Sequence, residues 1–330
     1  MAETDNKKLV LAILGPTASG KTSVALKIAK ENNGIIINCD SRQIYQEMLI
    51  GTASPTEKEK SIVEHRLFNF LSPNMQFNAS DYAKLAADEI RKVWSESKLP
   101  VLVGGTGFYY SAVSEGLGEA GSDSVLAKQL QEELEEKGLP YMVEKLRKLD
   151  SEAVETIDIN NSRRVLRAIE VVMTTHKPFS QNKPVPLLPD AEFKPIVVTR
   201  PREILHERIA LRVNQMFEEG LEEEFKHIVE KYGKDAAALS SIGYREWLDC
   251  FEEKKDLLKI EGNALPPHLN MARNDDFNKC FSNDDIKSIK EQIIIHTRQY
   301  AKRQETWFRK KPGVPFVEPE DISLNLQFYH

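Results

Sequence analysis

The sequence has few of the features that mark a secreted or membrane protein. Its 3 cysteines lie far apart among 330 residues and form no CxxC pair, which argues against a disulfide scaffold and a cysteine-based zinc site. No stretch approaches the roughly 20 apolar residues that span a bilayer. The first residues are polar and lack the apolar core of a signal peptide. We therefore expect a cytoplasmic protein with no membrane partner.

An excess of positive charge is also missing. The 45 Lys and Arg residues are outnumbered by 51 Asp and Glu residues, which gives a net charge of −6. This balance argues against a protein that coats nucleic acid nonspecifically, although it allows a local basic patch. Hydrophobic residues make up 41% and charged residues 29%, as in soluble globular proteins. The length allows about two domains.

Short apolar runs separated by a helical pattern open the chain. Residues 9–14, 35–39 and 101–103 are typical of buried parallel strands because the runs are short, bounded and largely β-branched. Residues 21–32 carry apolar side chains at helical spacing between the first two runs, which makes a βαβ unit. With a further strand over 194–199, the sequence predicts an α/β fold with a parallel sheet. Its ligands should bind at the carboxyl ends of the strands.

A helical region interrupts this pattern. Residues 124–137, 140–149 and 162–175 have amphipathic spacing, no strand-like run lies between them, and a proline-rich connector follows. This arrangement predicts a helical domain inserted into an α/β domain. The expected boundaries are 1–118 for the first part of the core, 119–192 for the inserted helical domain and 193–330 for the second part of the core.

The last part of the chain contains two further features. Residues 252–283 have weak periodicity and polar clusters, and we expect them to form a surface insertion. Ser282 and Asp285 resemble a capping box, which predicts the start of a long C-terminal helix. Three basic residues of this helix recur four and seven positions apart and so share one face, and they are Arg298, Lys302 and Arg309.

Aromatic residues are interleaved with these cations. We expect Tyr300, Trp307 and Phe308 to pack on the sheet. A run of charge on a helix is usually solvated surface, so the basic face becomes a candidate contact for a nucleic-acid backbone only with further support.

The strongest motif is GPTASGKT at 15–22, which satisfies GxxxxGK[ST] between a predicted strand and a predicted helix. Its glycines let the backbone amides converge on phosphate oxygens, and the helix N-terminus adds a favourable potential. Lys21 can neutralise the terminal phosphate and Thr22 can ligate Mg²⁺. The motif predicts a P-loop NTPase-like sheet and a di- or triphosphate ligand, without naming the reaction. The predicted phosphate-binding residues are Gly15, Pro16, Thr17, Ala18, Ser19, Gly20, Lys21 and Thr22.

Polar residues follow two other predicted strands. Asp40 ends the second strand and begins the run Asp-Ser-Arg-Gln, and Thr106 lies in the Gly-Gly-Thr-Gly run that ends the third strand. These ends should face the phosphate loop across one crevice, where Asp40 could act as a general base or orient a nucleophile. Each could also be an ordinary loop residue, a carboxylate cap or a tight turn.

Three kinds of reaction remain open on these residues alone. A small-molecule kinase would use a nucleoside triphosphate as a phosphoryl donor, a binding or switch protein would use it as a signal, and another transferase would hold a diphosphate as its leaving group. The sequence contains no apolar run followed by an aspartate of the Walker B kind and no guanine-reading NKxD segment, which weakens the NTPase and switch hypotheses.

Seven segments, in order and across nearly the whole chain, resemble the bacterial tRNA dimethylallyltransferases. The terminal segment and the glycine-rich segment at the end of the third predicted strand are the most specific. The chain departs from the family pattern at Arg66, where a second histidine is frequent. The matched segments are GPTASGKT at 15–22, DSRQIY at 40–45, IGTASPT at 50–56, VGGTGFYYSAV at 103–113, SRRVLRAIEV at 162–171, SIGYRE at 241–246 and TRQYAKRQETWFRK at 297–310.

The resemblance implies transfer of a dimethylallyl group from dimethylallyl diphosphate to the exocyclic amine (N6) of an adenosine adjacent to the anticodon in tRNA. It implies that the phosphate loop holds the diphosphate, with Thr17 and Lys21 at the reaction, and that Asp40 is the base at the adenine amine. Thr106 would lie at the donor or the target nucleotide. Mg²⁺ at Thr22 is the expected cofactor, and we expect a monomer. Further diphosphate contacts are expected from Arg208 and Arg212.

The partner implied is the anticodon stem-loop of tRNA. The implied contacts come from the strand-end loops, the inserted domain, the segment before 246 and the basic helix face. They are Asp40, Ser41, Arg42, Gln43, Thr106, Arg163, Arg164, Val165, Leu166, Arg167, Ser240, Ser241, Ile242, Gly243, Tyr244, Arg245, Arg298, Lys302 and Arg309. Phe108 and Tyr109 are candidates for an apolar wall around the prenyl chain. A prenyltransferase acting on free adenylate and a P-loop kinase are the alternatives.

Overall fold

The computed structural model describes residues 7–118, 123–260 and 281–322. The chain divides into two compact units, one formed by Met1–Tyr110 with Asp190–His330 and the other by Ser111–Pro189. The second unit begins and ends somewhat earlier than the inserted domain expected over 119–192. In the part of the chain that the structure describes, no helix combines the length and the apolar character needed to cross a bilayer.

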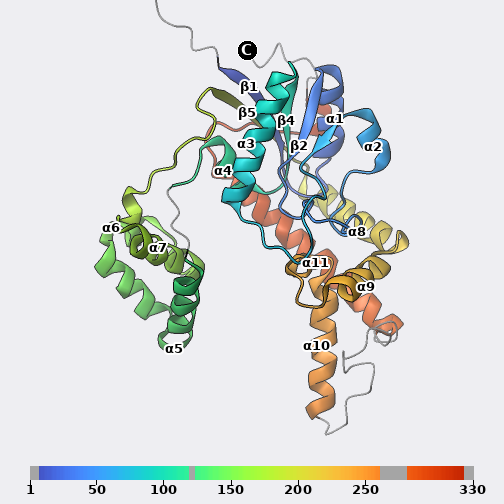
Figure 1. The fold of residues 1–330 in the computed structure, drawn as a ribbon. Helices are drawn as coiled ribbons and strands as arrows, with labels where there is room; N and C mark the ends of the chain where they lie inside the picture. Colours follow the sequence, from blue (N-terminus) through green and yellow to red (C-terminus); the bar gives the residue numbers. More distant parts are fainter. Residues whose placement is uncertain (1–6, 119–122, 261–280, 323–330) are drawn as a thin grey trace, which may run out of the picture. The chain divides into compact units, whose positions relative to one another are not determined.

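A six-stranded parallel sheet forms the centre of the first unit (Figure 1). Its strands are β1 (Lys8–Leu14), β2 (Gly34–Asn38), β3 (His65–Arg66), β4 (Leu99–Gly104), β5 (Ala191–Val198) and β6 (Phe316–Val317). Their spatial order is β3-β2-β4-β1-β5-β6. The predicted α/β fold is therefore confirmed, with the four predicted strands found as β1, β2, β4 and β5. The two edge strands β3 and β6 are too short to leave a periodic pattern in the sequence.

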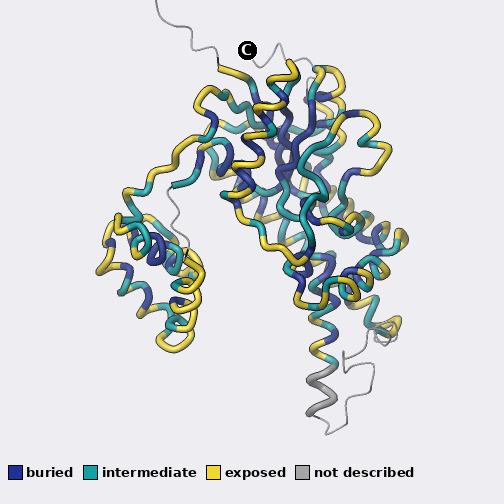
Figure 2. The backbone as a smooth tube through the Cα atoms, viewed as in Figure 1, coloured by how far each residue is buried: buried dark blue, intermediate teal, exposed yellow. Residues whose placement is uncertain are grey.

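The central strand β1 of this sheet is apolar where it is buried. Val10, Leu11, Ala12 and Ile13 of β1 have no exposed surface, and Figure 2 shows the central strands as buried. A strand covered on both faces reads as a continuous apolar run, which is why the sequence revealed it.

The helices of the first unit pack on this sheet and on one another. One apolar cluster joins the first helix to the sheet, and a second joins the later helices to the loop that follows β2. The helices are α1 (Lys21–Glu31), α2 (Glu57–Ile62), α3 (Ala79–Ser95), α4 (Gly107–Ser114, which crosses into the second unit), α8 (Arg202–Glu218), α9 (Leu221–Tyr232), α10 (Arg245–Ile260) and α11 (Asn283–Arg309).

The expected surface insertion over 252–283 needs a correction. Residues 252–260 belong to helix α10, which continues to Ile260, and so are not part of an insertion. Residues 261–280 lie outside the described residues. The capping box that predicts the start of α11 is confirmed, because the Ser282 and Asp285 side chains each bond the backbone N–H group of the other.

The second unit is helical and has its own core. Val165, Ile169, Met142 and Leu146 are buried in a cluster that joins its helices. The two helices predicted over 124–137 and 140–149 are confirmed as the two helical segments of α5 (Ser124–Leu149), which are separated at Gly138 by a non-helical backbone with a φ of 79°. It is followed by α6 (Ser151–Thr156) and α7 (Ser162–Thr175).

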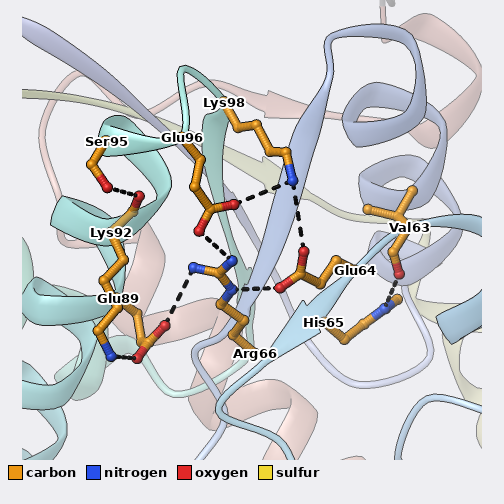
Figure 3. Close-up of polar contacts among 9 residues, drawn as sticks. All are labelled: Val63, Glu64, His65, Arg66, Glu89, Lys92, Ser95, Glu96 and Lys98. Atoms are coloured by element: carbon orange, nitrogen blue, oxygen red, sulfur yellow. Dashed lines mark hydrogen bonds and ion pairs between the residues drawn. The ribbon is translucent and has the colours of Figure 1, made fainter.

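An ion-pair network fastens the edge strand β3 to its neighbours. Arg66 contacts Glu64 and Glu96 at 2.7 Å each and Glu89 of α3 at 3.5 Å, and Lys98 contacts two of the same carboxylates (Figure 3). The planar guanidinium presents its donors as a fork that suits several carboxylates at once. This network holds the start of the segment that supports the loop after β2, as described below.

We expect Arg66→Met to lower the free energy of unfolding by about 1 kcal/mol, because three carboxylates would lose their shared cation while two of them remain partly in water. Chemical denaturation at low and high salt would measure the effect, which should shrink as salt screens the pairs. The matched control is Arg91→Met, which removes an exposed ion pair between Arg91 and Asp88 of helix α3. Equal losses for the two variants would contradict a special role for the Arg66 network.

Candidate active site

The phosphate loop leaves β1 in a conformation that only small residues can adopt. Gly15 has a φ of 144°, and a Cβ there would lie 2.2 Å from the carbonyl oxygen of Val198. Ala18 and Gly20 also have positive φ angles, of 63° and 97°. Alternating backbone angles of this kind turn successive N–H groups toward one point, which forms a nest for an anion. The Ser19 hydroxyl is buried without a partner among the described residues, as expected of a donor held for a ligand.

Cationic side chains surround this loop. The Nε atom of Arg208 donates to the Ala18 carbonyl at 2.8 Å, and Arg212 donates to the Thr17 hydroxyl at 3.3 Å. Burial lowers the pKa of Lys21 to about 8; the Asp40 charge opposes this shift and Arg212 adds to it. Burial also lowers the pKa of Arg212. Cations that lose hydration in this way gain most from an anionic ligand, so the loop favours a polyphosphate.

Asp40 is held rigidly at the end of β2. One carboxylate oxygen, Oδ1, accepts the Arg42 N–H at 2.9 Å. The buried Asn38 side chain accepts the Asp40 N–H at 2.9 Å and donates to the Asp40 carbonyl and to the Leu67 carbonyl, each at 3.0 Å. Leu67 directly follows β3. The Arg66 network therefore anchors the segment on which the Asp40 loop rests.

Thr106 is joined to the same loop from β4. Its hydroxyl oxygen accepts the Ser41 N–H at 2.9 Å, and its own N–H donates to the Cys39 carbonyl at 3.2 Å. A Cβ at Gly104 would lie 2.0 Å from that Cys39 carbonyl oxygen, so glycine permits the close approach of the two strand ends. The structure thus brings the loops that carry Asp40 and Thr106 together, as the sequence predicted, and Asp40 but not Thr106 lines the cavity described below.

Helix α11 contributes side chains that sequence reasoning missed. Gln304 accepts the Thr17 N–H at 3.0 Å and donates to the Gly105 carbonyl at 2.9 Å. Tyr300, which we expected to pack on the sheet, instead lines a cavity together with Asp40, and burial together with the Asp40 charge raises the pKa of its phenol. Both residues lie in the last matched segment. A single sequence does not show which of two equally polar faces of a helix points into the protein.

Two adjoining cavities make up the site. One, of about 490 Å³, contains Lys21, Thr22 and Arg208. The other, of about 260 Å³, contains Asp40 and Tyr300. Arg212 and Met216 line both cavities, so the phosphate loop and the carboxylate face a common wall. The second cavity also has an apolar side formed by Ile209, Val213, Met216, Ile242 and Ile293.

This apolar side corrects one expectation. Phe108 and Tyr109 were candidates for the prenyl-binding wall, but Phe108 is exposed and Tyr109 stacks on Tyr82 with ring centroids 4.0 Å apart. Neither residue lines the two cavities, and the apolar side chains that do line the second one come from helices α8 and α11 and the residues before α10. Aliphatic residues at helical spacing look like ordinary core positions in a sequence, so nothing distinguished these from the rest of the interior.

Some predicted RNA contacts line the second cavity and others do not. Arg42, Ser240, Ile242, Gly243 and Arg245 line it. Gln43 lines the first cavity and donates through Nε2 to the Thr52 and Ala53 carbonyls.

Three predicted contacts are corrected by burial. The side chains of Tyr244, Ser241 and Val165 are at most 2% exposed, so they cannot reach an RNA from solvent. The Tyr244 hydroxyl donates to Glu224 instead, at 2.5 Å. They were predicted as RNA contacts because they belong to continuous motif segments, in which other side chains are more exposed.

Glu224 of α9 is another residue that sequence reasoning missed. Its carboxylate accepts the N–H groups of Leu49, Ile50 and Gly51 at 2.6 to 2.9 Å. A Cβ at Gly51 would lie 2.6 Å from the Tyr244 ring. Glu224 and Tyr244 therefore fix the loop over 49–54 that lines both cavities.

The second unit contributes exposed cations of its own. Arg163 and Arg164 are exposed at the start of α7, Leu166 packs on the core of the unit, and Arg167 contacts Glu170 at 2.6 Å. Their contact with RNA stays a prediction.

The basic face of α11 lines a groove. Arg298, Lys302 and Arg309 share a cavity of about 510 Å³ with Arg202 and His206 of α8. Arg309 is paired with Glu305 at 2.6 Å, and Arg298 donates to the His206 carbonyl at 3.5 Å. The groove retains a positive charge that suits a phosphate backbone.

The residues around Thr22 fit a substrate-bound Mg²⁺ ion. The described residues contain no group of three or more His, Cys, Asp or Glu side chains that could hold a metal by themselves. Magnesium usually binds through substrate phosphates, water and one or two protein oxygens. The Thr22 hydroxyl, in the same cavity as Lys21, offers such an oxygen.

Together with the fold, this geometry defines an enzyme of the P-loop α/β class, in which the cavity beside the phosphate loop adjoins a second, partly apolar cavity. The sequence profile described as "IPP transferase" matches residues 43–311, which is most of the chain. The chain therefore belongs to the IPP transferase family, and it is a prenyltransferase.

Individual relatives agree with this assignment. A protein of Acetivibrio thermocellus named tRNA dimethylallyltransferase is 38% identical, with 97% of this chain and 96% of the relative covered. The crystal structure of the full-length tRNA isopentenylpyrophosphate transferase of Bacillus halodurans is 32% identical with a TM-score of 0.61, covering 98% of this chain and 93% of the other. A eukaryotic dimethylallyltransferase acting on tRNA, 22% identical with a TM-score of 0.72 and covering 95% and 74% of the two chains, shares the fold.

Proposed function

We propose that the protein transfers the dimethylallyl group of dimethylallyl diphosphate to N6 of an adenosine adjacent to the anticodon of tRNA and releases diphosphate. The observation that carries this proposal is the common wall of the two cavities: Arg212 and Met216 line both the cavity of the phosphate loop and the cavity of Asp40. A donor whose diphosphate sits in the loop can therefore place its allylic carbon beside the carboxylate. The names of the relatives support a five-carbon prenyl group as the group transferred and tRNA as the acceptor.

The chain's own groups support departure of the diphosphate. As the bond between the allylic carbon and its oxygen breaks, negative charge grows on the diphosphate. Lys21 and Arg212 line the cavity beside the phosphate loop, so these cations and the loop amides can stabilise that charge where it appears. Mg²⁺ held at Thr22 and the phosphate oxygens would neutralise further charge.

Asp40 supports the other half of the reaction. The adenine amine is a weak nucleophile, and it forms a bond to the allylic carbon more readily if a carboxylate takes its proton at the same time. Asp40 faces the second cavity with its backbone fixed by Asn38. The apolar side of that cavity accepts the prenyl chain and one face of the base.

The acceptor must reach a cavity inside the protein. An adenine stacked in an anticodon loop cannot do so, hence we expect the target base to be flipped out of its stack. The basic groove beside α11 can hold the RNA backbone while the base enters.

We expect Lys302→Gln combined with Arg309→Gln to weaken tRNA binding and to reduce the slope of log affinity against log salt by about one to two, because up to two phosphate contacts would be lost. Filter binding or anisotropy at several salt concentrations would measure both quantities. Lys84→Gln with Lys287→Gln removes the same charge from exposed positions elsewhere and should leave the slope unchanged. If the two double variants behave alike, the groove does not bind the backbone.

One experiment tests the proposed reaction against its alternatives. The protein is incubated with labelled dimethylallyl diphosphate or γ-labelled ATP, each with tRNA and with AMP. We expect prenyl label in tRNA at the adenosine. Label in AMP would indicate an adenylate prenyltransferase, and phosphoryl transfer from ATP would indicate a kinase, and either result would overturn the proposal.

A further inference from the structure

Gln304 joins three parts of the active site that are remote in sequence. It lies on α11 and is 5% exposed. Its side chain accepts a hydrogen bond from the Thr17 N–H of the phosphate loop and donates one to the Gly105 carbonyl. Gly105 precedes Thr106. One side chain therefore bridges the loop after β1 and the loop after β4.

The surrounding backbone is shaped for this contact. A Cβ at Gly105 would lie 2.1 Å from Nε2 of Gln304, and one at Gly107 would lie 2.2 Å from the ring of Trp307. The loop thus approaches α11 closely on both sides of Thr106, and only glycine allows the approach. Gln304 and Trp307 are three residues apart and share one face of the helix.

A primary amide suits the position because the two partners have opposite needs. The Thr17 N–H requires an acceptor and the Gly105 carbonyl requires a donor. A glutamine side chain offers one carbonyl oxygen and two N–H groups, whereas a carboxylate only accepts and a lysine only donates. A buried group that loses such a partner costs free energy, so the bridge resists distortion.

The same helix also reaches the substrates on both sides. Tyr300 and Arg303 line the cavity that contains Asp40, and Arg298 and Lys302 line the basic groove. Gln304 thus links helix α11, which lines the proposed acceptor site, to the phosphate loop, which lines the proposed donor site.

We propose that Gln304 is a positioning residue for the transfer reaction: its amide sets the phosphate loop against the Thr106 loop and so aligns the departing diphosphate with the acceptor site. This inference rests on the proposed function. Gln304 does not touch the reacting atoms, and its effect is on the alignment that lowers the barrier to transfer.

The test compares Gln304→Met with the wild type in steady-state transfer from dimethylallyl diphosphate to tRNA. Methionine keeps the length of the side chain and removes both hydrogen bonds. We expect kcat to fall at least about tenfold, while the Kd for tRNA stays within twofold. Gln292→Met, at an exposed position of the same helix, is the matched control and should behave as the wild type. Circular dichroism at the assay temperature establishes that the variants are folded.

A second variant gives a pH signature that loss of packing alone would not produce. Gln304→Glu keeps an acceptor for the Thr17 N–H but, when ionised, cannot donate to Gly105. Its activity relative to the wild type should rise as pH falls, because the protonated carboxyl regains the donor. A flat ratio together with an unimpaired Gln304→Met would overturn the inference while wild-type transfer to tRNA still upheld the proposed function. Absence of wild-type transfer would instead overturn the proposed function itself.

Discussion

Asp40→Asn is expected to lower kcat for prenyl transfer by about 10² or more, the typical contribution of a positioned general base. Asparagine has nearly the same shape and can still accept the Arg42 N–H that holds Oδ1, but it cannot take the proton of the adenine amine. Affinity for tRNA should stay close to that of the wild type. Single-turnover transfer and a separate binding measurement distinguish the two effects.

The matched control is Asp88→Asn, an exposed carboxylate on α3 whose partner is Arg91. It makes the same chemical change away from the cavities and should leave kcat unaltered. If Asp40→Asn retains full turnover, the proton of the amine leaves by another route and Asp40 is not the base.

Lys21→Met is the second substitution with a large expected effect. It removes the lysine ammonium of the phosphate loop, so we expect kcat/KM for the donor to fall by about 10²–10³, the range seen when a preorganised charge-stabilising group is lost. Binding of tRNA should not change. Lys27→Met, at an exposed position of the same helix, is the control for a lost surface charge.

The same lysine predicts a pH dependence of donor binding. Its pKa in the free protein is about 8, lowered chiefly by burial, and a bound diphosphate would favour the charged form and raise it. Below pH 8 the ammonium is already present, and affinity for the donor should not depend on this group. Above pH 8 binding must take up a proton, so affinity should fall by up to tenfold per pH unit.

Isothermal titration with the donor between pH 6.5 and 9.5 would follow this dependence. The proton uptake should appear in buffers of different ionisation enthalpy and should be missing in Lys21→Met. An identical pH profile in the variant would assign the dependence to another group.

The parts of the site that the sequence predicted are those whose residues lie next to one another in the chain. The phosphate loop is such a case, because its glycines, lysine and threonine must occur at fixed spacing between a strand and a helix. Asp40 and Thr106 were also found, because each directly follows a recognisable strand and parallel strands end at the same edge of a sheet.

The missed residues act across long distances in sequence. Gln304 bonds Thr17 across 287 positions, and Glu224 bonds Gly51 across 173. Such contacts leave no local periodicity, and a polar residue on an amphipathic helix looks the same whether it faces solvent or a backbone amide. The buried Tyr244 was misjudged for the related reason that membership of a motif does not say which of its side chains face outward.

The position of β1 has a consequence for synthesis of the protein on the ribosome. Among the described strands it is made first, yet it pairs with β4 on one side and β5 on the other. While Ser111–Pro189 is translated, the β5 side of β1 has no partner strand, and that edge is available for wrong pairing until Ala191–Val198 emerges. Since the inserted unit has a core of its own, it can fold during this interval. The nascent chain would then contain a folded second unit and an incomplete sheet in the first unit.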